Sequence, residues 1–289
     1  MKMTLEKDAA PSTTDTSTPN PAKPIVKVPN SRLRRWLTIL AVKTGQRVCR
    51  KRGCVILFPF RICIKRSSIT HSLAEAKSLL FVADNTDVPV PRVYCAFMRK
   101  DVAYTVMSRI KGETLRLQWS KMSETARASI LQQLVTMMSK LRSIEPSKGA
   151  GVGNLGGGPL FDQRVPGPSN IFGPFARVAD FHRFLRRGYE EADANEEVME
   201  LIRMQKEVED EPIVFTHGDL SSFNIMVKGD KVTGIIDWET AGWFPAYWES
   251  AVAKGAAELH SFWGDEVPRL LEPSKRTWEM EALRRRLFA

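Results

Sequence analysis

THGDLSSFNI, residues 216–225, and GIIDWE, residues 234–239, carry the most informative polar side chains of this chain. Asp219, Asn224 and Asp237 each lie beside an apolar run that predicts a short β-strand. A Lys-Gly-Asp turn between the two segments lets these strands pair as a hairpin, because glycine accepts the backbone angles of a tight turn. We therefore expect all three side chains at one edge of that hairpin.

Phosphoryl transfer is the chemistry that such a trio suits. Mg²⁺ on a phosphate chain takes oxygen ligands, usually one or two of them from the protein. A further carboxylate must accept the proton of the attacking hydroxyl group. The spacing from Asp219 to Asn224 equals that in the catalytic loop of protein kinases, whose metal-binding aspartate also comes later in the chain. A single HGD would fit a polar turn in an ordinary sheet as well, but the ordered set of three favours catalysis.

The same residues resemble the aminoglycoside phosphotransferase and choline-kinase-like superfamily. Gly218 stands where protein kinases have the Arg of H-R-D, and Trp238-Glu239 stands where they have the Phe-Gly of D-F-G. With its flanks, VFTHGDL to GIIDWETAGWFP, the region looks most like fungal members of the phosphotransferase enzyme family. A protein kinase is the less favoured alternative, because the sequence also lacks an A-P-E segment.

That resemblance implies a protein-kinase-like α+β fold with two lobes, a small, mostly antiparallel β N-lobe and a larger, mostly helical C-lobe. It also implies ATP- and Mg²⁺-dependent transfer of the γ-phosphate to a hydroxyl group of a small molecule. Asp219 would then accept or orient the hydroxyl proton, while Asn224 and Asp237 would bind Mg²⁺. We interpret His217 as a structural residue of the catalytic loop rather than as the base.

The N-lobe supplies the second half of the expected site. Residues 62–65 form an apolar run that ends in a lysine, which by itself is usually a solvated strand edge. Family members follow such a lysine with a helix that carries Glu-Ala and ends near Pro-Val-Pro, and residues 72–82 and 88–91 match this order. The resemblance implies that Lys65 contacts the α- and β-phosphates and that Glu75 holds it as an ion pair.

The resemblance also places a hinge between the lobes, after a strand pair at 93–97 and 103–107. Adenine would bind there to main-chain groups, although the same residues also fit an ordinary strand end. The expected adenine contacts are Met107, Ser108, Arg109 and Ile110. A glycine-rich phosphate loop is expected between the first two strands, and only Gly45 and Gly53 are available there.

This poor phosphate loop keeps a second hypothesis open. The chain would then be a catalytically weak or inactive kinase-like protein that binds nucleotide or acts as a scaffold. Its weakness is that the expected ion pair and the expected base and metal ligands are all present. These are Lys65, Glu75, Asp219, Asn224 and Asp237.

Composition divides the chain into three parts. Residues 1–30 are rich in Pro, Ser and Thr and predict a disordered tail. The N-lobe would occupy 31–108 and the C-lobe 109–289, within a chain long enough for a large core. No apolar run has the length of a membrane span, and the N-terminus lacks the apolar core of a signal peptide. With four cysteines at no zinc-binding spacing, we expect a cytoplasmic protein.

The net charge is +10, and much of the excess lies in a basic cluster at residues 32–52. Such a cluster can bind nucleic acid or an anionic membrane surface, or it can be a solvated face near a nucleotide site. No nucleic-acid motif accompanies it, so we do not expect nucleic-acid binding. Apolar residues within the cluster recur at helical spacing and predict a helix over the N-lobe, and residues 47–50 alternate and predict a strand. The helical positions are Leu33, Trp36, Leu37 and Leu40.

The acceptor is expected to be chosen outside the motifs, within residues 149–211. Residues 149–174 form a Gly- and Pro-rich loop of a length that is often functional. The acidic stretch 190–211 could attract a cationic acceptor such as an aminoglycoside, although we favour a solvated helix face. Nothing in the sequence indicates an obligate protein partner. The final arginines, 284–286, are interpreted as a frayed basic end.

Overall fold

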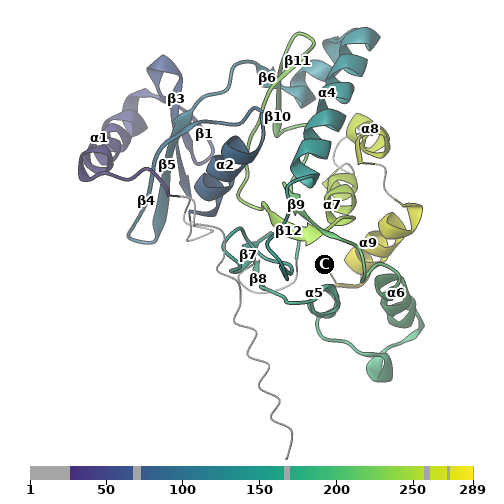
Figure 1. Ribbon diagram of the computed structural model, residues 1–289. Helices are drawn as coiled ribbons and strands as arrows, with labels where there is room; N and C mark the ends of the chain where they lie inside the picture. Colours follow the sequence, from purple (N-terminus) through teal and green to yellow (C-terminus); the bar gives the residue numbers. More distant parts are fainter. Residues whose placement is uncertain (1–26, 68–72, 166–169, 257–260, 272–273, 289) are drawn as a thin grey trace, which may run out of the picture.

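The computed structural model describes residues 27–67, 73–165, 170–256, 261–271 and 274–288 of the chain. Most of the predicted N-terminal tail lies outside the described residues. The chain forms a small lobe built on an antiparallel sheet and a larger, mostly helical lobe (Figure 1). The expected bilobal, protein-kinase-like α+β fold is therefore confirmed.

The N-lobe is a five-stranded antiparallel sheet in the order β1-β2-β3-β5-β4. Its strands are β1 (Arg50–Arg52), β2 (Val55–Leu57), β3 (Ile62–Ser67), β4 (Val93–Arg99) and β5 (Val102–Ser108). Its helices are α1 (Arg32–Val48) and α2 (Ala74–Asn85). Successive side chains of a strand face opposite sides of the sheet. Ile64 packs in one cluster with Val42 of α1, and Cys63 packs in another with Leu79 of α2, so the two helices cover opposite faces.

Helix α1 confirms the predicted helix, and Ser31 caps it by accepting a hydrogen bond from Arg34 N–H at 3.3 Å. The helix is longer than expected, because Cys49 N–H still donates to Gly45 O at 2.9 Å. The predicted strand over residues 47–50 is therefore wrong, and β1 begins only at Arg50. Helix α1 packs on the sheet through Thr38, Val42 and Gly45 rather than through the apolar positions that predicted it.

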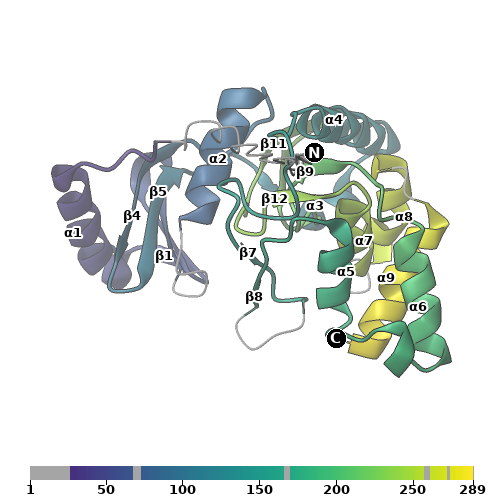
Figure 2. The same ribbon diagram turned by 60° about the horizontal axis from the view of Figure 1, so that its bottom comes forward.

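The C-lobe begins after the hinge and combines helices with three small antiparallel sheets (Figures 1 and 2). Its helices are α3 (Leu115–Gln118), α4 (Glu124–Arg142), α5 (Val178–Leu185), α6 (Glu196–Lys206), α7 (Trp248–Ala256), α8 (Ser261–Leu271) and α9 (Lys275–Phe288). Its strands are β6 (Glu113–Thr114), β7 (Leu160–Phe161), β8 (Ile171–Phe172), β9 (Ile213–Thr216), β10 (Ile225–Lys228), β11 (Lys231–Ile235) and β12 (Gly242–Pro245). The sheets have the orders β11-β10-β6, β12-β9 and β7-β8.

The predicted hairpin after the catalytic loop is present as β10 and β11, and Gly229 in its turn has a φ of +61°. Ser123 caps helix α4 by accepting a hydrogen bond from Ala126 N–H at 3.2 Å. The expectation of a frayed basic end is wrong. Arg284 lies buried in α9 and makes a two-point ion pair with Glu281 at 2.7 Å, because residues three apart on a helix are neighbours. No helix among the described residues is long and apolar enough to cross a bilayer.

Candidate active site

The loop predicted to be catalytic joins β9 to β10, and His217 is one of the residues that fix it. The Nδ1 atom of His217 accepts a hydrogen bond from Asp219 N–H at 3.1 Å, so its Nε2–H donates to Ile236 O at 3.1 Å. Burial lowers the pKa of His217, which keeps the imidazole neutral in this network. This geometry fits the structural role predicted for His217, since both ring nitrogens are committed to the main chain.

Gly218 has a backbone conformation that no other residue adopts easily. Its φ is +78°, and a Cβ atom there would lie 2.7 Å from the main-chain oxygen of Thr240. The local backbone therefore explains why residue 218 is a glycine. An arginine at this position would strain the backbone and collide with the main chain at Thr240.

Asp219 and Asn224 face each other across the loop. The Asn224 Nδ2 group donates to the carboxylate of Asp219 and to its main-chain oxygen, both at 2.8 Å. Burial raises the pKa of Asp219, while Arg164 and the Asn224 hydrogen bond oppose that rise. Ile236 N–H donates to Asn224 O at 2.9 Å, which brings Asp237 beside Asn224 as the hairpin prediction expected. The structure thus places all three predicted polar residues in one site.

Lys65 connects the two lobes at this site. It comes from β3, its side chain is only 7% exposed, and its Nζ lies 3.2 Å from Glu75 Oε2 on α2. The same Nζ lies 2.5 Å from Asp237 Oδ1 and 3.1 Å from Glu239 Oε2. Burial would lower the pKa of Lys65, but the surrounding carboxylates outweigh it and raise that pKa. Burial raises the pKa of Glu75, and the nearby carboxylates of Asp237 and Glu239 add to that rise, while Lys65 opposes it.

Asn224 and Asp237 present a donor set that fits Mg²⁺. Because the Nδ2 group of Asn224 is committed to Asp219, its amide oxygen is left for a metal, and Asp237 contacts Lys65 through Oδ1 alone. One amide oxygen and one carboxylate, completed by phosphate oxygens and water, is a usual arrangement for Mg²⁺. Within the described residues, no group of three or more His, Cys, Asp or Glu side chains is placed to hold a metal without such added ligands.

Arg164 is a site residue that sequence reasoning missed. It comes from the long loop before α5, and its Nη1 atom lies 3.2 Å from Asp219 Oδ1. Asp162, which is 2% exposed, holds the guanidinium at two points, 2.7 and 2.8 Å away. Arg164 Nη2 also donates to Gly218 O. Only the D-x-R spacing within a Gly- and Pro-rich loop could have drawn attention to this pair, and that spacing says nothing about where the loop folds.

Two glutamates were also missed as parts of the site. Glu239 shares Lys65 with Asp237, from which it is two residues away. Glu249, in the first turn of α7, is buried and accepts hydrogen bonds from His217 N–H at 2.6 Å and Gly218 N–H at 3.2 Å. A carboxylate on two main-chain amides is a strong anchor, so α7 holds the start of the catalytic loop.

The hinge residues predicted to contact adenine lie together but differ in their surroundings. Met107 is buried, and Cys63 Sγ lies 3.6 Å from its carbonyl oxygen. Ser108 N–H donates to Arg92 O, and Arg109 N–H donates to Arg61 O at 2.7 Å. These two amides are therefore already engaged within the N-lobe. The side chain of Ile110 packs over Gly234 in β11.

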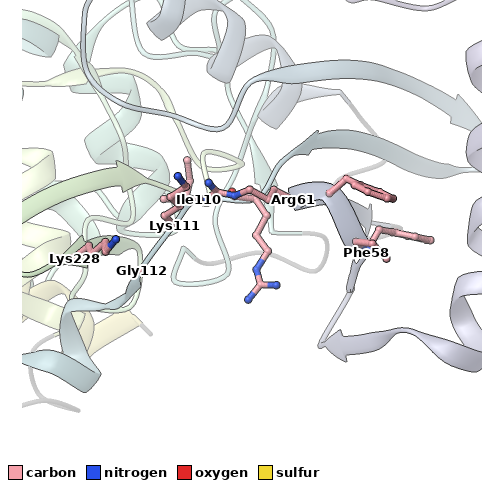
Figure 3. Close-up of a pocket in the computed structure, with 9 residues that line it drawn as sticks. Phe58, Arg61, Ile110, Lys111, Gly112 and Lys228 are labelled. Atoms are coloured by element: carbon pink, nitrogen blue, oxygen red, sulfur yellow. The ribbon is translucent and has the colours of Figure 1, made fainter.

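A cavity of about 740 Å³ opens beside this hinge (Figure 3). Phe58 borders it on the N-lobe side, and Lys111 and Lys228 border it on the C-lobe side. Arg109 and Ile110 line it, whereas none of the polar residues of the catalytic loop does. The cavity therefore belongs to the hinge end of the cleft.

The acidic stretch that could have attracted a cationic acceptor is largely occupied by ion pairs. Glu190 pairs with Arg183 at 2.7 Å, Glu191 pairs with Lys206 at 2.5 Å, and Glu197 pairs with Arg286 at 2.8 Å. These pairs lie on the surface around α5, α6 and α9. They fit the solvated helix face that the sequence favoured.

Comparisons with known proteins point to one family. A family model described as phosphotransferase enzyme family matches residues 60–288. Among solved structures, aminoglycoside phosphotransferase APH(4)-Ia has a TM-score of 0.59 at 16% identity, covering 88% of this chain and 89% of its own. A thermostable mutant of it, in ternary complex with AMP-PNP and hygromycin B, has a TM-score of 0.56 at 16% identity, with 87% and 88% covered.

Aminoglycoside phosphotransferase APH(3'')-Id from Streptomyces rimosus has a TM-score of 0.51 at 17% identity, covering 89% of this chain and 99% of its own. No curated protein matches the chain. At such identities the likeness to solved structures shows the fold, and the family rests on the match to residues 60–288.

Proposed function

The chain belongs to the phosphotransferase enzyme family, and we propose that it transfers the γ-phosphate of ATP, with Mg²⁺, to a hydroxyl group of a small molecule. One observation carries this proposal. The carboxylate of Asp219 is fixed by Asn224 next to Asp237, which in turn contacts the buried Lys65–Glu75 pair of the other lobe. Solved relatives in complex with ADP or AMP-PNP support ATP as the donor.

In the proposed reaction, the acceptor hydroxyl gives its proton to Asp219 as its oxygen attacks the γ-phosphorus. The bond from that phosphorus to the oxygen bridging it to the β-phosphate breaks, and ADP leaves. Burial raises the pKa of Asp219, which makes the carboxylate a better proton acceptor. Lys65 would contact the α- and β-phosphates, and its present carboxylate partners hold it in the cleft for that contact.

Mg²⁺ would be held by Asn224 and Asp237, where it would neutralise the charge of the β- and γ-phosphates. Arg164 would act from the acceptor side. Its guanidinium already lies against Asp219, so it can orient that carboxylate and stabilise negative charge near the transferred group. We therefore propose Arg164 as a positioning residue of the site.

The adenine would lie at the hinge between residues 107 and 110. Because the amides of Ser108 and Arg109 are engaged, we propose that adenine is bound mainly by the remaining main-chain groups of this segment and by apolar contact with Ile110. The neighbouring cavity gives the hinge end of the cleft room for a ligand.

The second candidate is a kinase-like protein that binds nucleotide without efficient turnover. One observation favours it: Gly53 and Cys54 alone connect β1 to β2, which leaves no loop to wrap a phosphate chain. The complete set of polar residues in the cleft favours the enzyme.

The test is a screen of small-molecule alcohols, aminoglycosides included, that measures ADP release in the presence of Mg-ATP. Asp219→Asn serves as the blank, because it keeps the shape of the side chain and removes the base. We expect at least one acceptor for which the wild type releases ADP and the variant does not, while both are stabilised by Mg-ATP. Stabilisation of both proteins with no turnover on any acceptor would favour the scaffold, and wild-type turnover by Asp219→Asn would refute the role of this residue.

A further inference from the structure

The outer face of helix α1 carries an exposed apolar stripe. Leu33, Trp36, Leu37 and Leu40 are 65%, 62%, 49% and 45% exposed. Their spacing places them on one side of the helix, opposite the residues that pack on the sheet. Figures 1 and 2 both show α1 at the outer edge of the N-lobe, with the sheet on its inner side and the helical lobe far away.

Positive charge is concentrated in the same region. Residues 16–74 contain 13 Lys and Arg and no Asp or Glu, whereas the rest of the chain has 30 Lys and Arg against 33 Asp and Glu. The whole net charge of +10 therefore comes from this segment. The exposed cations of α1 and of the adjoining strand β1 are Arg32, Arg34, Arg35, Lys43, Arg47, Arg50, Lys51 and Arg52.

An apolar cavity adjoins the stripe. It has a volume of about 350 Å³ and lies between α1 and the end of β4. Trp36, Ile39 and Phe97 line it with Met98, and two arginines, Arg35 and Arg99, complete the lining. Apolar walls next to guanidinium groups suit a molecule that has both an apolar part and an anionic part.

We propose that α1 binds the surface of an anionic lipid bilayer. An amphipathic helix lies in a membrane interface when it combines a bulky apolar face that includes Trp with flanking Lys and Arg. Each such cation adds attraction to the negative leaflet surface. The apolar stripe would enter the boundary between head groups and acyl chains, and the cations of α1 and β1 would contact lipid phosphates.

Other occupants of the stripe fit less well. Nucleic acid attracts cations through its phosphates, but its phosphate backbone would not bury four exposed apolar side chains of a helix. A second copy of this chain would bring two strongly positive surfaces together. Of these three occupants, the anionic bilayer is the one that matches both the apolar stripe and the positive charge.

Bilayer binding would leave the proposed active site accessible. Cys63 and Lys65 share the face of β3 that is covered by α2, because alternate residues of a strand point the same way. Ile64 points toward α1 on the other face. The sheet therefore separates the lipid-binding surface from the cleft, and this inference does not depend on the proposed function.

The test is sedimentation of the full chain with lipid vesicles. We expect binding to phosphatidylcholine vesicles that contain phosphatidylserine, weaker binding as salt is added, and little binding to pure phosphatidylcholine. The variant Trp36→Gln/Leu37→Gln/Leu40→Gln and the variant Arg50→Gln/Lys51→Gln/Arg52→Gln should each bind the anionic vesicles about tenfold or more weakly. Since all six positions are exposed, both variants should keep the wild-type melting temperature.

Matched controls use exposed positions far from α1. Leu117→Gln removes an exposed apolar side chain of the C-lobe, and Lys121→Gln/Lys148→Gln/Lys275→Gln removes three exposed cations there. Both controls should bind like the wild type. A second readout is the fluorescence of Trp36, which is the most exposed of the seven tryptophans. Brominated lipid should quench this fluorescence. The variant Trp36→Phe should abolish the quenching while binding persists.

Three outcomes would overturn the inference. The first is no binding of the wild type to anionic vesicles. The second is an equal loss of binding in the α1 and β1 variants and in their controls, which would show that binding does not depend on this surface. The third is a wild-type dimer that the Trp36→Gln/Leu37→Gln/Leu40→Gln variant converts to a monomer without lipid, which would show that a second copy covers the stripe.

Discussion

Burial and the neighbouring side chains shift the pKa of Asp219 in opposite directions. Burial disfavours its charge, whereas Arg164 and Asn224 favour it. Arg164 can do so because Asp162 lies buried behind it and fixes the guanidinium at two points. A guanidinium forms two parallel hydrogen bonds with a carboxylate, which an ammonium cannot do. The orientation of Asp219 thus depends on a residue 55 positions earlier in the chain.

We predict that Arg164→Gln lowers kcat by about a hundredfold or more, because it removes an oriented charge next to the reacting groups. The KM for ATP should change little, since Arg164 contacts Asp162, Asp219 and Gly218 and none of the residues proposed to bind ATP. Arg164→Lys should restore only part of kcat. Steady-state ADP release with an acceptor found in the screen measures all three. A kcat for Arg164→Gln within twofold of the wild type would exclude a role in the reaction.

His182 predicts a pH dependence of stability. Burial first, and then nearby Arg186, lower its pKa from 6.5 to about 3, and its Nε2 lies 2.8 Å from the hydroxyl of buried Tyr247. The unfolded chain binds a proton below pH 6.5 and the folded chain does not, so stability falls as the pH drops from that point towards 3. At pH 5 the loss should be about 2 kcal/mol.

Urea unfolding at pH 7.5 and pH 5 measures this effect. The difference in unfolding free energy between the two pH values should be about 2 kcal/mol smaller in His182→Gln than in the wild type. Both proteins share the other titrating groups, so the contributions of these groups to the pH dependence cancel in the comparison. Equal differences in the two proteins would show that His182 is protonated in the folded state.

At the scale of elements, helices far along the chain support the catalytic loop. Helix α7 supplies Glu249, which accepts hydrogen bonds from the amides of His217 and Gly218. Helix α9 packs against α6 and α7 and carries a buried ion pair between Glu281 and Arg284. The C-terminal arginines therefore belong to the body of the C-lobe, not to a solvated end.

We predict that Arg284→Ala lowers the free energy of unfolding by about 3 kcal/mol or more, because it removes the two-point partner of the buried Glu281 carboxylate and leaves only the longer contact with Arg285 at 3.8 Å. The control is Arg286→Ala, whose partner Glu197 is 49% exposed, and it should cost less than about 1 kcal/mol. Chemical denaturation of the two variants measures both values. Equal losses would mean that α9 frays at its end after all.

At the scale of the whole molecule, the two lobes share a core as well as a site. Leu79 and Val82 of α2 belong to the same buried cluster as Phe215 and Trp243 of the C-lobe, and Phe81 lies 5.0 Å from the ring of Phe215. Lys65 adds an ion pair from the N-lobe to Asp237 and Glu239 of the C-lobe. A ligand in the cleft should therefore stabilise the folded chain as a unit.

We predict that Mg-ATP at a hundred times its dissociation constant stabilises the protein by about 2.7 kcal/mol. Such a gain should raise the melting temperature by several degrees. ATP with a chelator should give a smaller rise, and so should Mg-ATP with Asp237→Asn, because the proposed metal site is then empty or incomplete. A rise of the same size under all three conditions would contradict a metal site at Asp237.

The sequence alone determined the family resemblance, which implied the bilobal fold. It also determined the positions of the polar trio, because these depend on local order: strands, a tight turn and three residues within 18 positions of one another. Helical spacing and apolar runs also predicted α1, β3 and the β4–β5 pair. The strand predicted over residues 47–50 was wrong, because packing of Gly45 extends α1 to Val48, over a stretch that alternates like a strand.

Only the tertiary structure decided which distant charges meet. Asp162 and Arg164 reach Asp219 because a loop without regular spacing folds back on the catalytic loop, and no local pattern encodes that path. The same holds for α1: its apolar spacing predicted a helix, but spacing cannot say which face is buried. Helix α1 packs on the sheet through Thr38, Val42 and Gly45, because their small side chains allow a close approach. The bulkier apolar stripe faces solvent.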